Sequence, residues 1–341
     1  MVLDFTDRIN RKIEDTRILK QGYQQINGFI FKALVYPANI FDAIVVHIPP
    51  NAHAWGNSTV LSQRTLAEHI EFINIHKLDK AIIIAENLYF LTCCPSLKHL
   101  CIIPADTAGA DFDYSPLYDM PEILSLTCAT EYGKFLSYQT NLDYSRINGL
   151  QSIQINSGNH LCFEDIPTLR SLALSESTNI NLNGLFSSKY LDTLSISTSK
   201  IRSLLGIEHA TCLQCLYLSY NRSLCDIQQI ESVATSLRAL RIEASPKIHD
   251  FSVLKKLKNL EYLCLKGNNV LSSLCFLKEL PKLKTLIFDM DVKDGDLTPC
   301  LDLGYVHCSK FRKHYNLKAE ELPKTIFVHG NEGIDLWRRL C

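Results

Sequence analysis

The sequence predicts an α/β solenoid, in which short parallel strands stack side by side and short helical segments return the chain behind them. Three observations support this prediction. An L-x-x-L-x-L motif recurs in constant phase, and a second apolar triplet with a period of three follows most copies. The composition, with 46% hydrophobic and 21% charged residues in 341, also supplies enough apolar side chains for a continuous core.

The recurring motif is the strongest of these observations. Seven segments match it, and their first residues are 19, 22, 22, 24, 23 and 23 positions apart. Alternate residues of a strand face opposite sides, so the apolar positions of each copy form one buried row. A single copy cannot bury this row alone, so the copies must stack. The seven triplets are Leu150-Ile153-Ile155, Leu169-Leu172-Leu174, Leu191-Leu194-Ile196, Leu213-Leu216-Leu218, Leu237-Leu240-Ile242, Leu260-Leu263-Leu265 and Leu283-Leu286-Phe288.

The second triplet predicts the return segment of each repeat. Its spacing of i, i+3, i+6 suits a 3₁₀ helix, in which side chains three residues apart lie on one side. Two repeats also carry an asparagine after the strand, where a buried amide can bond turn backbone groups; we expect Asn221 and Asn268 in this role, and Ser177, Ser199, Ser245 or Asp291 elsewhere. The triplets are Ile201-Leu204-Ile207, Leu224-Ile227-Ile230, Ile248-Phe251-Leu254 and Leu271-Leu274-Leu277.

Weaker copies and irregular flanks complete the organisation. Copies are predicted at Leu78-Ala81-Ile83, Leu97-Leu100-Ile102 and Pro121-Leu124-Leu126, and the 29-residue step from Pro121 to Leu150 predicts an insertion near 127–148. The N-terminal region is expected to contain strands at 29–35 and 43–48 and a helix at 61–75. The basic cluster at 310–314 is either a solvated cap or a docking patch. The expected domains are a capping region at 1–77, the solenoid at 78–300 and a C-terminal cap at 301–341.

These repeats resemble the roughly 22-residue leucine-rich repeats of bacterial internalins and of the phosphatase-regulatory type. The segments FDMDVKDGDLTPCLDLGYV and KHYNLKAEELPK are similar to the end of a group of uncharacterised bacterial leucine-rich-repeat proteins. The resemblance implies a leucine-rich-repeat solenoid, with a curved parallel sheet on its concave face and 3₁₀ or helical returns on its convex face. It also suggests a bacterial immunity or inhibitor protein directed against a toxin or effector.

Several other functions are disfavoured by the composition and motifs. A net charge of −1, from 35 basic and 36 acidic residues, argues against a nucleic-acid partner. We see no leader-like or membrane-spanning apolar stretch, which favours a cytoplasmic protein without membrane contact. Phosphate-binding loops, a nucleophile elbow and zinc helices are missing, so we expect no enzyme, catalytic residue or cofactor.

The thirteen cysteines are predicted to be reduced thiols that serve as small apolar side chains, as at Cys215, Cys264 and Cys275. A secreted disulfide framework is the less favoured alternative. The Cys212–Cys215 pair has C-x-x-C spacing, which allows metal or redox chemistry, but no second pair lies at a suitable distance. We therefore expect no metal site.

The outward positions of each strand give a map of the concave face. The early copies present an apolar patch, Ile82, Ile84, Cys101 and Ile103, unless the N-terminal cap or the insertion covers it. The central copies present small residues: Ser171, Ala173, Ser175, Thr193, Ser195 and Ser197. The later copies present residue types that are enriched at binding sites, and the predicted partner-binding residues are Tyr217, Tyr220, Arg241, Glu243, Tyr262, Lys266 and Asp289.

This map predicts a protein partner, and a monomer rather than a homo-oligomer. The alternative interpretation of the same outward residues is a merely solvated face that binds no partner. The alternative function is a scaffold or adaptor module that organises a complex or self-associates.

Overall fold

The computed structural model describes residues 23–32, 43–48, 64–105, 112–128, 142–156 and 163–324. The chain divides into two compact units, residues 1–156 (unit 1) and residues 157–341 (unit 2). Within the described ranges, every helix is too short or too polar to span a bilayer.

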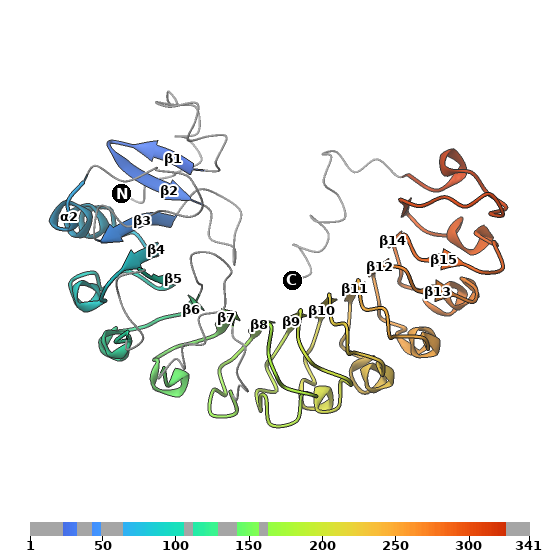
Figure 1. The fold of residues 1–341 in the computed structure, drawn as a ribbon, viewed down its shortest axis with the longest axis horizontal. Coiled ribbons are helices and arrows are strands. Elements are labelled where there is room, and N and C mark those ends of the chain that lie inside the picture. The colour runs from blue at the N-terminus through green and yellow to red at the C-terminus, as the bar shows by residue number, and fades with distance from the viewer. Residues whose placement is uncertain are drawn as a thin grey trace. The chain divides into compact units, whose positions relative to one another are not determined.

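The described part of unit 1 begins with an antiparallel hairpin and continues as a parallel sheet (Figure 1). β1 pairs antiparallel with β2 and β2 with β3, whereas β3 through β7 pair in parallel. Among the described residues of this unit, the α-helix α2 (Leu66–His76) and three 3₁₀ helices lie between the parallel strands. The elements are β1 (Tyr23–Ile26), β2 (Phe29–Lys32), β3 (Ala43–Ile48), β4 (Lys80–Ala85), η1 (Tyr89–Cys93), β5 (His99–Pro104), η2 (Ser115–Asp119), β6 (Ser125–Cys128), η3 (Tyr144–Arg146) and β7 (Ser152–Asn156).

The first elements of unit 1 follow local sequence signals. Asn27 and Gly28 both have positive φ, 50° and 79°, which is the backbone of a two-residue hairpin turn between β1 and β2. β1 is absent from the predicted elements, although this Asn-Gly pair is a signal for such a hairpin. The predicted helix begins later than expected, at Leu66, because Thr65 and Glu68 form a capping box that fixes its first turn.

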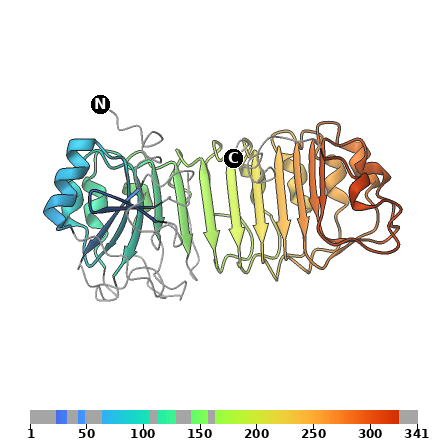
Figure 2. The same ribbon diagram turned by 90° about the horizontal axis from the view of Figure 1, so that it is seen from above.

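Unit 2 contains the most regular repeats, and its strands run in parallel (Figure 2). Each strand is followed by a return segment, most of them containing a 3₁₀ helix behind the sheet (Figure 1). The strands are β8 (Ser171–Ser175), β9 (Thr193–Ser197), β10 (Cys215–Ser219), β11 (Ala239–Glu243), β12 (Tyr262–Lys266), β14 (Thr285–Phe288) and β16 (Tyr305–Cys308), with β13 (Val270–Leu271) and β15 (Asp291–Val292) in a separate two-stranded sheet. The 3₁₀ helices are η4 (Ile207–His209), η5 (Gln228–Val233), η6 (Ser252–Lys256), η7 (Cys275–Glu279), η8 (Thr298–Cys300) and η9 (Ala319–Glu321).

The strand register confirms the repeat predicted from the sequence. The second apolar residue of each motif is paired with its counterpart in the next strand, and all of these leucines are fully buried. This row contains Leu172, Leu194, Leu216, Leu240, Leu263 and Leu286. The second triplet lies behind it and is also buried, as Leu204, Ile227 and Leu254 show. The chain therefore folds as a leucine-rich-repeat solenoid.

The predicted frame of one early repeat was wrong by two residues. Leu126 pairs with Leu100 on one side and Ile153 on the other, so it occupies the second motif position rather than the third. Ile123 and Cys128 take the first and third positions, and both are buried. The prediction placed Leu124 in the motif because isoleucine and cysteine stand where leucine is expected.

The corrected frame also changes the predicted insertion near 127–148. Residues 129–141 lie outside the described residues. Residues 142–147, however, form an ordinary return segment around η3, and the side chains of Leu142, Tyr144 and Ile147 are buried. This part of the predicted insertion is therefore core and not a projecting loop.

The turns after β8 to β12 are held by buried polar side chains, whereas the predicted Asp291 lies in β15, is only partly buried and pairs with Arg312. Asn221 donates from Nδ2 to the Ile196 carbonyl (2.8 Å) and accepts at Oδ1 from the Ser199 amide (3.0 Å). Ser177, Ser199 and Ser245 are buried at the equivalent position in other repeats. In the repeat of β12 the role falls to Asn269, which donates to the Ile248 carbonyl (2.7 Å), whereas the predicted Asn268 is exposed.

Replacing Asn221 by alanine is expected to lower the free energy of unfolding by about 2 kcal/mol, because two buried backbone groups lose their partner. The measurement is urea denaturation followed by circular dichroism. Asn268→Ala is the matched control and should change stability by less than about 0.5 kcal/mol, since its side chain is exposed. Equal losses in both variants would contradict the assignment of the buried amide.

The end of unit 2 is closed by a segment that lies against the last strand. Lys324 forms an antiparallel bridge with Tyr305 of β16, and the Val306 amide donates to the Pro323 carbonyl (2.9 Å). Two members of the basic cluster face acidic residues of the preceding repeat: Lys310–Asp289 (3.5 Å) and Arg312–Asp291 (3.6 Å). These contacts favour the solvated cap over the docking patch.

The domain boundaries at 77 and 300 stay predictions. The parallel pairing itself extends beyond both of them, since β3 pairs with β4 and β14 pairs with β16.

Candidate interaction face of unit 2

The outward side chains of unit 2 form three rows that cross its strands. The first row contains the first residue of each strand, the second row the third residue and the third row the fifth. The first row is Ser171, Thr193, Cys215, Ala239, Tyr262, Thr285 and Tyr305; the second is Ala173, Ser195, Tyr217, Arg241, Cys264, Ile287 and His307; the third is Ser175, Ser197, Ser219, Glu243 and Lys266.

Three of the predicted binding residues lie around the carboxylate of a fourth, Glu243. Glu243 accepts a hydrogen bond from the Tyr217 hydroxyl at Oε2 (3.0 Å) and one from Arg241 Nη2 at Oε1 (2.8 Å). Lys266 Nζ lies 4.0 Å from the same Oε1. The Arg241 guanidinium also lies over the Tyr217 ring, 4.9 Å from its centroid. We call Tyr217, Arg241, Glu243 and Lys266 the Glu243 network; it links β10, β11 and β12 and is held in one arrangement.

The electrostatics of the network follow from its partial burial. Burial raises the pKa of Tyr217, and the neighbouring Glu243 carboxylate acts in the same direction. Burial alone would lower the pKa of Arg241, but the adjacent Glu243 carboxylate outweighs it, so the pKa is raised and Arg241 keeps its charge. The Nε atom of Arg241 is buried without a hydrogen-bond partner among the described residues.

The remaining predicted residues border the network. Asp289 accepts from the Gly267 amide at Oδ1 (2.6 Å) and pairs with Lys310, so part of its charge is used within the fold. Tyr220 lies just after β10 at φ 54°, and 56% of its surface is exposed. It belongs to the rim of the face rather than to one of the rows.

Tyr262 lies on the predicted face but is not open to solvent as expected. Its side chain is only 1% exposed and packs with Cys215, Ala239 and Cys264, while Tyr217 lies against this cluster. Cys215, which was predicted to serve as a small apolar side chain, is fully buried in the same cluster. Strand alternation gives the direction of a side chain correctly, but it cannot show what lies over the face. The part that Tyr262 plays in partner binding stays a prediction.

The small residues of β8 and β9 were correctly placed on this face. The hydroxyls of Ser175 and Ser197 are 2.6 Å apart and share a hydrogen bond between neighbouring strands. Ser171, Ala173 and Ser195 are half-buried. The outward side chains on this part of the face are therefore short and mostly polar, and they lie next to the Glu243 network.

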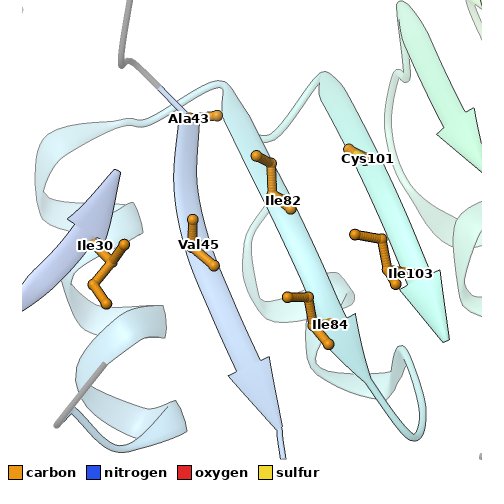
Figure 3. Packing of buried hydrophobic residues seen from close by; sticks show 7 residues of the cluster. All are labelled: Ile30, Ala43, Val45, Ile82, Ile84, Cys101 and Ile103. Carbon is orange, nitrogen blue, oxygen red and sulfur yellow. The ribbon is translucent and has the colours of Figure 1, made fainter. Parts of the chain in front are cut away.

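The apolar patch predicted from the early repeats is present in unit 1 but is buried. Ile82, Ile84, Cys101 and Ile103 project from β4 and β5 to the same side, where they form a cluster that also contains Ile30 of β2 (Figure 3). Ile30 extends this cluster along the sheet, because β2 pairs with β3 and β3 pairs with β4. The patch offers no open contact surface.

The cysteines are only partly as predicted. Ten cysteines in the described residues are free thiols: Cys93, Cys94, Cys101, Cys128, Cys212, Cys225, Cys264, Cys275, Cys300 and Cys308. Cys215, in contrast, is disulfide-bonded. Its partner is not Cys212, so the C-x-x-C pair does not form a disulfide. In the described part of the chain, no three or more His, Cys, Asp or Glu side chains gather as metal ligands would.

The similarity of this chain to known proteins lies in its fold. No protein-family model matches it, and no curated protein matches its sequence. Among solved structures, it is similar to an internalin from Listeria monocytogenes, with 16% identity and a TM-score of 0.43 over 70% of each chain. A leucine-rich-repeat protein of Leptospira interrogans is 14% identical, with a TM-score of 0.37 over 72% of this chain and 81% of that one. The mouse RP105/MD-1 complex gives 18% identity and a TM-score of 0.34 over 67% and 38%. The assignment of the leucine-rich-repeat fold rests on the period and strand register of the chain itself.

Proposed function

We propose that this protein binds a protein partner through the second and third rows of unit 2, without catalysing a reaction. The observation that carries the proposal is the Glu243 network. Tyrosine and arginine are the side chains most often found at binding hot spots, and here both are held in place by a shared carboxylate. Preorganised side chains lose little conformational entropy when a partner docks.

The network also suggests what the partner offers. Two cations, Arg241 and Lys266, share the single carboxylate of Glu243, which leaves one positive charge in excess. We therefore propose that an acidic side chain or a backbone carbonyl of the partner docks against Arg241. The small residues of β8 and β9 leave room for the partner backbone beside it.

The finer proposal is a bacterial, cytoplasmic immunity or inhibitor protein. Such a protein acts by covering the working surface of a toxin or effector in a one-to-one complex. A rigid face whose polar groups are already oriented suits this role, because inhibition then requires affinity and no chemistry.

An affinity-capture experiment with a matched pair of variants tests the proposal. Arg241→Ala should lower the affinity for the captured partner about 30-fold or more, since loss of a hot spot costs about 2 kcal/mol. Arg238→Ala is the control: Arg238 is an exposed arginine on the approach to the same strand, paired with Glu261 (2.9 Å) outside the rows. Its affinity should stay within about twofold. A partner that binds both variants as tightly as the unchanged protein would overturn the assignment of this face.

Sedimentation of the purified protein addresses the scaffold alternative. A monomer is expected. A stable homo-oligomer that Arg241→Ala dissociates, and Arg238→Ala does not, would show instead that the face joins copies of the chain.

A further inference from the structure

Four cationic residues stand at one edge of the unit 2 sheet, in the turns that follow β9, β10 and β11. They are Lys200, Arg202, Arg222 and Lys247. All four side chains are exposed. The three strands pair in parallel, so their turns lie side by side, about 4.8 Å apart (Figure 2). We call these four residues the basic edge.

The turns that carry the basic edge contain no acidic residue. They are residues 198–203, 220–225 and 244–249, and among these the four cations stand without an aspartate or glutamate. The edge is also limited to these three turns, because the preceding turn begins with Glu176 and the following one, 267–272, has no charged residue. The positive charge therefore extends over two strand spacings, about 10 Å.

Within the part of the chain that the structure describes, the cations of the basic edge form no ion pair. At the other end of the same strands, in contrast, Arg238 pairs with Glu261 (2.9 Å). The acidic residues that come next in the three repeats cap 3₁₀ helices: Glu208, Asp226 and Asp250 accept from backbone amides at the starts of η4, η5 and η6, at 2.9, 2.9 and 2.8 Å. Because neighbouring like charges repel one another, the edge attracts an anionic ligand.

An exposed aromatic side chain belongs to the middle turn of the basic edge. Tyr220 directly follows β10; it is 56% exposed, and its backbone is left-handed, with a φ of 54°. Bulky residues rarely adopt this backbone, and the equivalent residue of the β12 repeat is Gly267. The fold therefore does not require a tyrosine here, whereas tyrosine is among the side chains most enriched at binding hot spots.

The basic edge is continuous with the Glu243 network. The Tyr220 amide donates to the Glu243 carbonyl (2.9 Å), and the Ala244 amide donates to the Lys266 carbonyl (2.8 Å), so the turns begin where the third row ends. The network has one positive charge in excess, since Arg241 and Lys266 share one carboxylate. Both surfaces therefore attract ligands of the same sign, and a partner on the second and third rows reaches the edge within unit 2.

We propose that the basic edge binds an acidic segment of the protein partner, and that Tyr220 packs against this segment. The inference rests on the proposed protein-binding function and adds the chemistry of the partner. An extended chain advances about 3.3 Å per residue, so about three residues of the segment span the edge. A nucleic acid fits less well, because its binding draws on many phosphate contacts along a longer positive surface, and the net charge of the whole chain is −1.

A fluorescently labelled oligoglutamate peptide tests the basic edge in the full-length protein, with binding measured by fluorescence anisotropy. The double variant Lys200→Gln, Arg222→Gln should weaken binding about tenfold or more, because two of the four cations are lost. Lys282→Gln, Lys293→Gln is the matched control: it removes the same charge from exposed lysines outside the edge, and the affinity should stay within about twofold. Equal losses in both variants, or no binding to the unchanged protein, would contradict the proposal. An oligothymidylate that binds as tightly as the peptide would overturn the choice of a protein segment.

Tyr220→Gly separates the role of the tyrosine in binding from its role in folding. The variant should bind the same peptide about fivefold more weakly, because the aromatic contact is lost. Its midpoint of thermal unfolding should not fall, since glycine adopts the left-handed backbone without a steric cost. Thr198→Gly is the matched control, because Thr198 is exposed at the equivalent left-handed position of the preceding turn, with a φ of 49°. If Tyr220→Gly bound the peptide as tightly as Thr198→Gly, the contact assigned to Tyr220 would be incorrect.

The captured partner distinguishes this inference from the proposed function. We expect both Arg241→Ala and the Lys200→Gln, Arg222→Gln variant to weaken partner binding. If only Arg241→Ala weakens it, the basic edge lies outside the interface and the inference is wrong, while the proposed face stands. If only the edge variant weakens it, the partner binds at the basic edge, and the assignment of the second and third rows is wrong instead.

Discussion

Leu216→Ala is expected to lower the free energy of unfolding by about 2–5 kcal/mol, through lost apolar burial and the cavity that remains. Leu216 is fully buried, and it pairs with Leu194 on one side and Leu240 on the other. It therefore belongs to the contact that joins three successive repeats. Because each repeat is stabilised by its neighbours, a cavity here weakens two interfaces at once. Urea denaturation followed by circular dichroism measures the loss.

Ser195→Ala provides the comparison for this prediction. Ser195 directly follows Leu194 in the sequence, so its side chain lies on the opposite side of the sheet from the leucine row. It belongs to the second row, where it pairs with Tyr217, and it is half-buried. Its replacement should change stability by less than about 0.5 kcal/mol. If both variants lost the same stability, the division of each strand into a core side and an outward side would be incorrect.

Gly206→Ala should be the other strongly destabilising change, with an expected loss of about 3 kcal/mol or more. Gly206 has a φ of 104° and stands directly before η4. A Cβ atom there would lie 2.5 Å from the Asn183 amide nitrogen and 2.5 Å from the Leu182 carbonyl carbon. Both are backbone atoms of the preceding repeat and cannot rotate away. The left-handed backbone costs an L-residue about 1–2 kcal/mol, and relieving the clash costs about 1–3 kcal/mol more.

Gly184→Ala separates these two contributions. Gly184 also has a positive φ, 68°, but nothing lies within 4 Å of the Cβ position. Its replacement should therefore cost only the backbone contribution, about 1–2 kcal/mol. Calorimetry of the two variants against the unchanged protein gives the difference. A loss for Gly206→Ala no larger than that for Gly184→Ala would mean that the neighbouring repeats are not packed as closely as described.

The regular repeats were predictable because one local pattern recurs at a nearly constant period. The spacing of Leu194, Leu216 and Leu240 predicts that they pair in neighbouring strands, and the register confirms this pairing. Prediction was wrong where another residue type fills a standard position. Ile123 and Cys128 replace leucines in the repeat of β6, and Asn269 replaces Asn268 in the turn after β12.

The sequence predicted which side chains form the candidate site and which side of the sheet they face, but it did not predict how exposed they are to solvent. Alternation along β10 and β11 correctly brought Tyr217, Arg241 and Glu243 to one face. The convergence of both cations on Glu243 depends on side-chain conformations, which a one-dimensional pattern does not contain. The burial of Tyr262 depends on whatever lies over the sheet.

The sequence by itself determined the repeat period, the alternation of inward and outward side chains and the order of the strands, since all three follow from local spacing along one chain. Only the tertiary structure decided that Cys215 carries a disulfide, that the first row is covered and that the unit 1 patch is closed. The physical reason is the range of the interactions. A strand orients its side chains through its own backbone geometry, whereas burial and cross-linking require residues that are distant in sequence to meet in space.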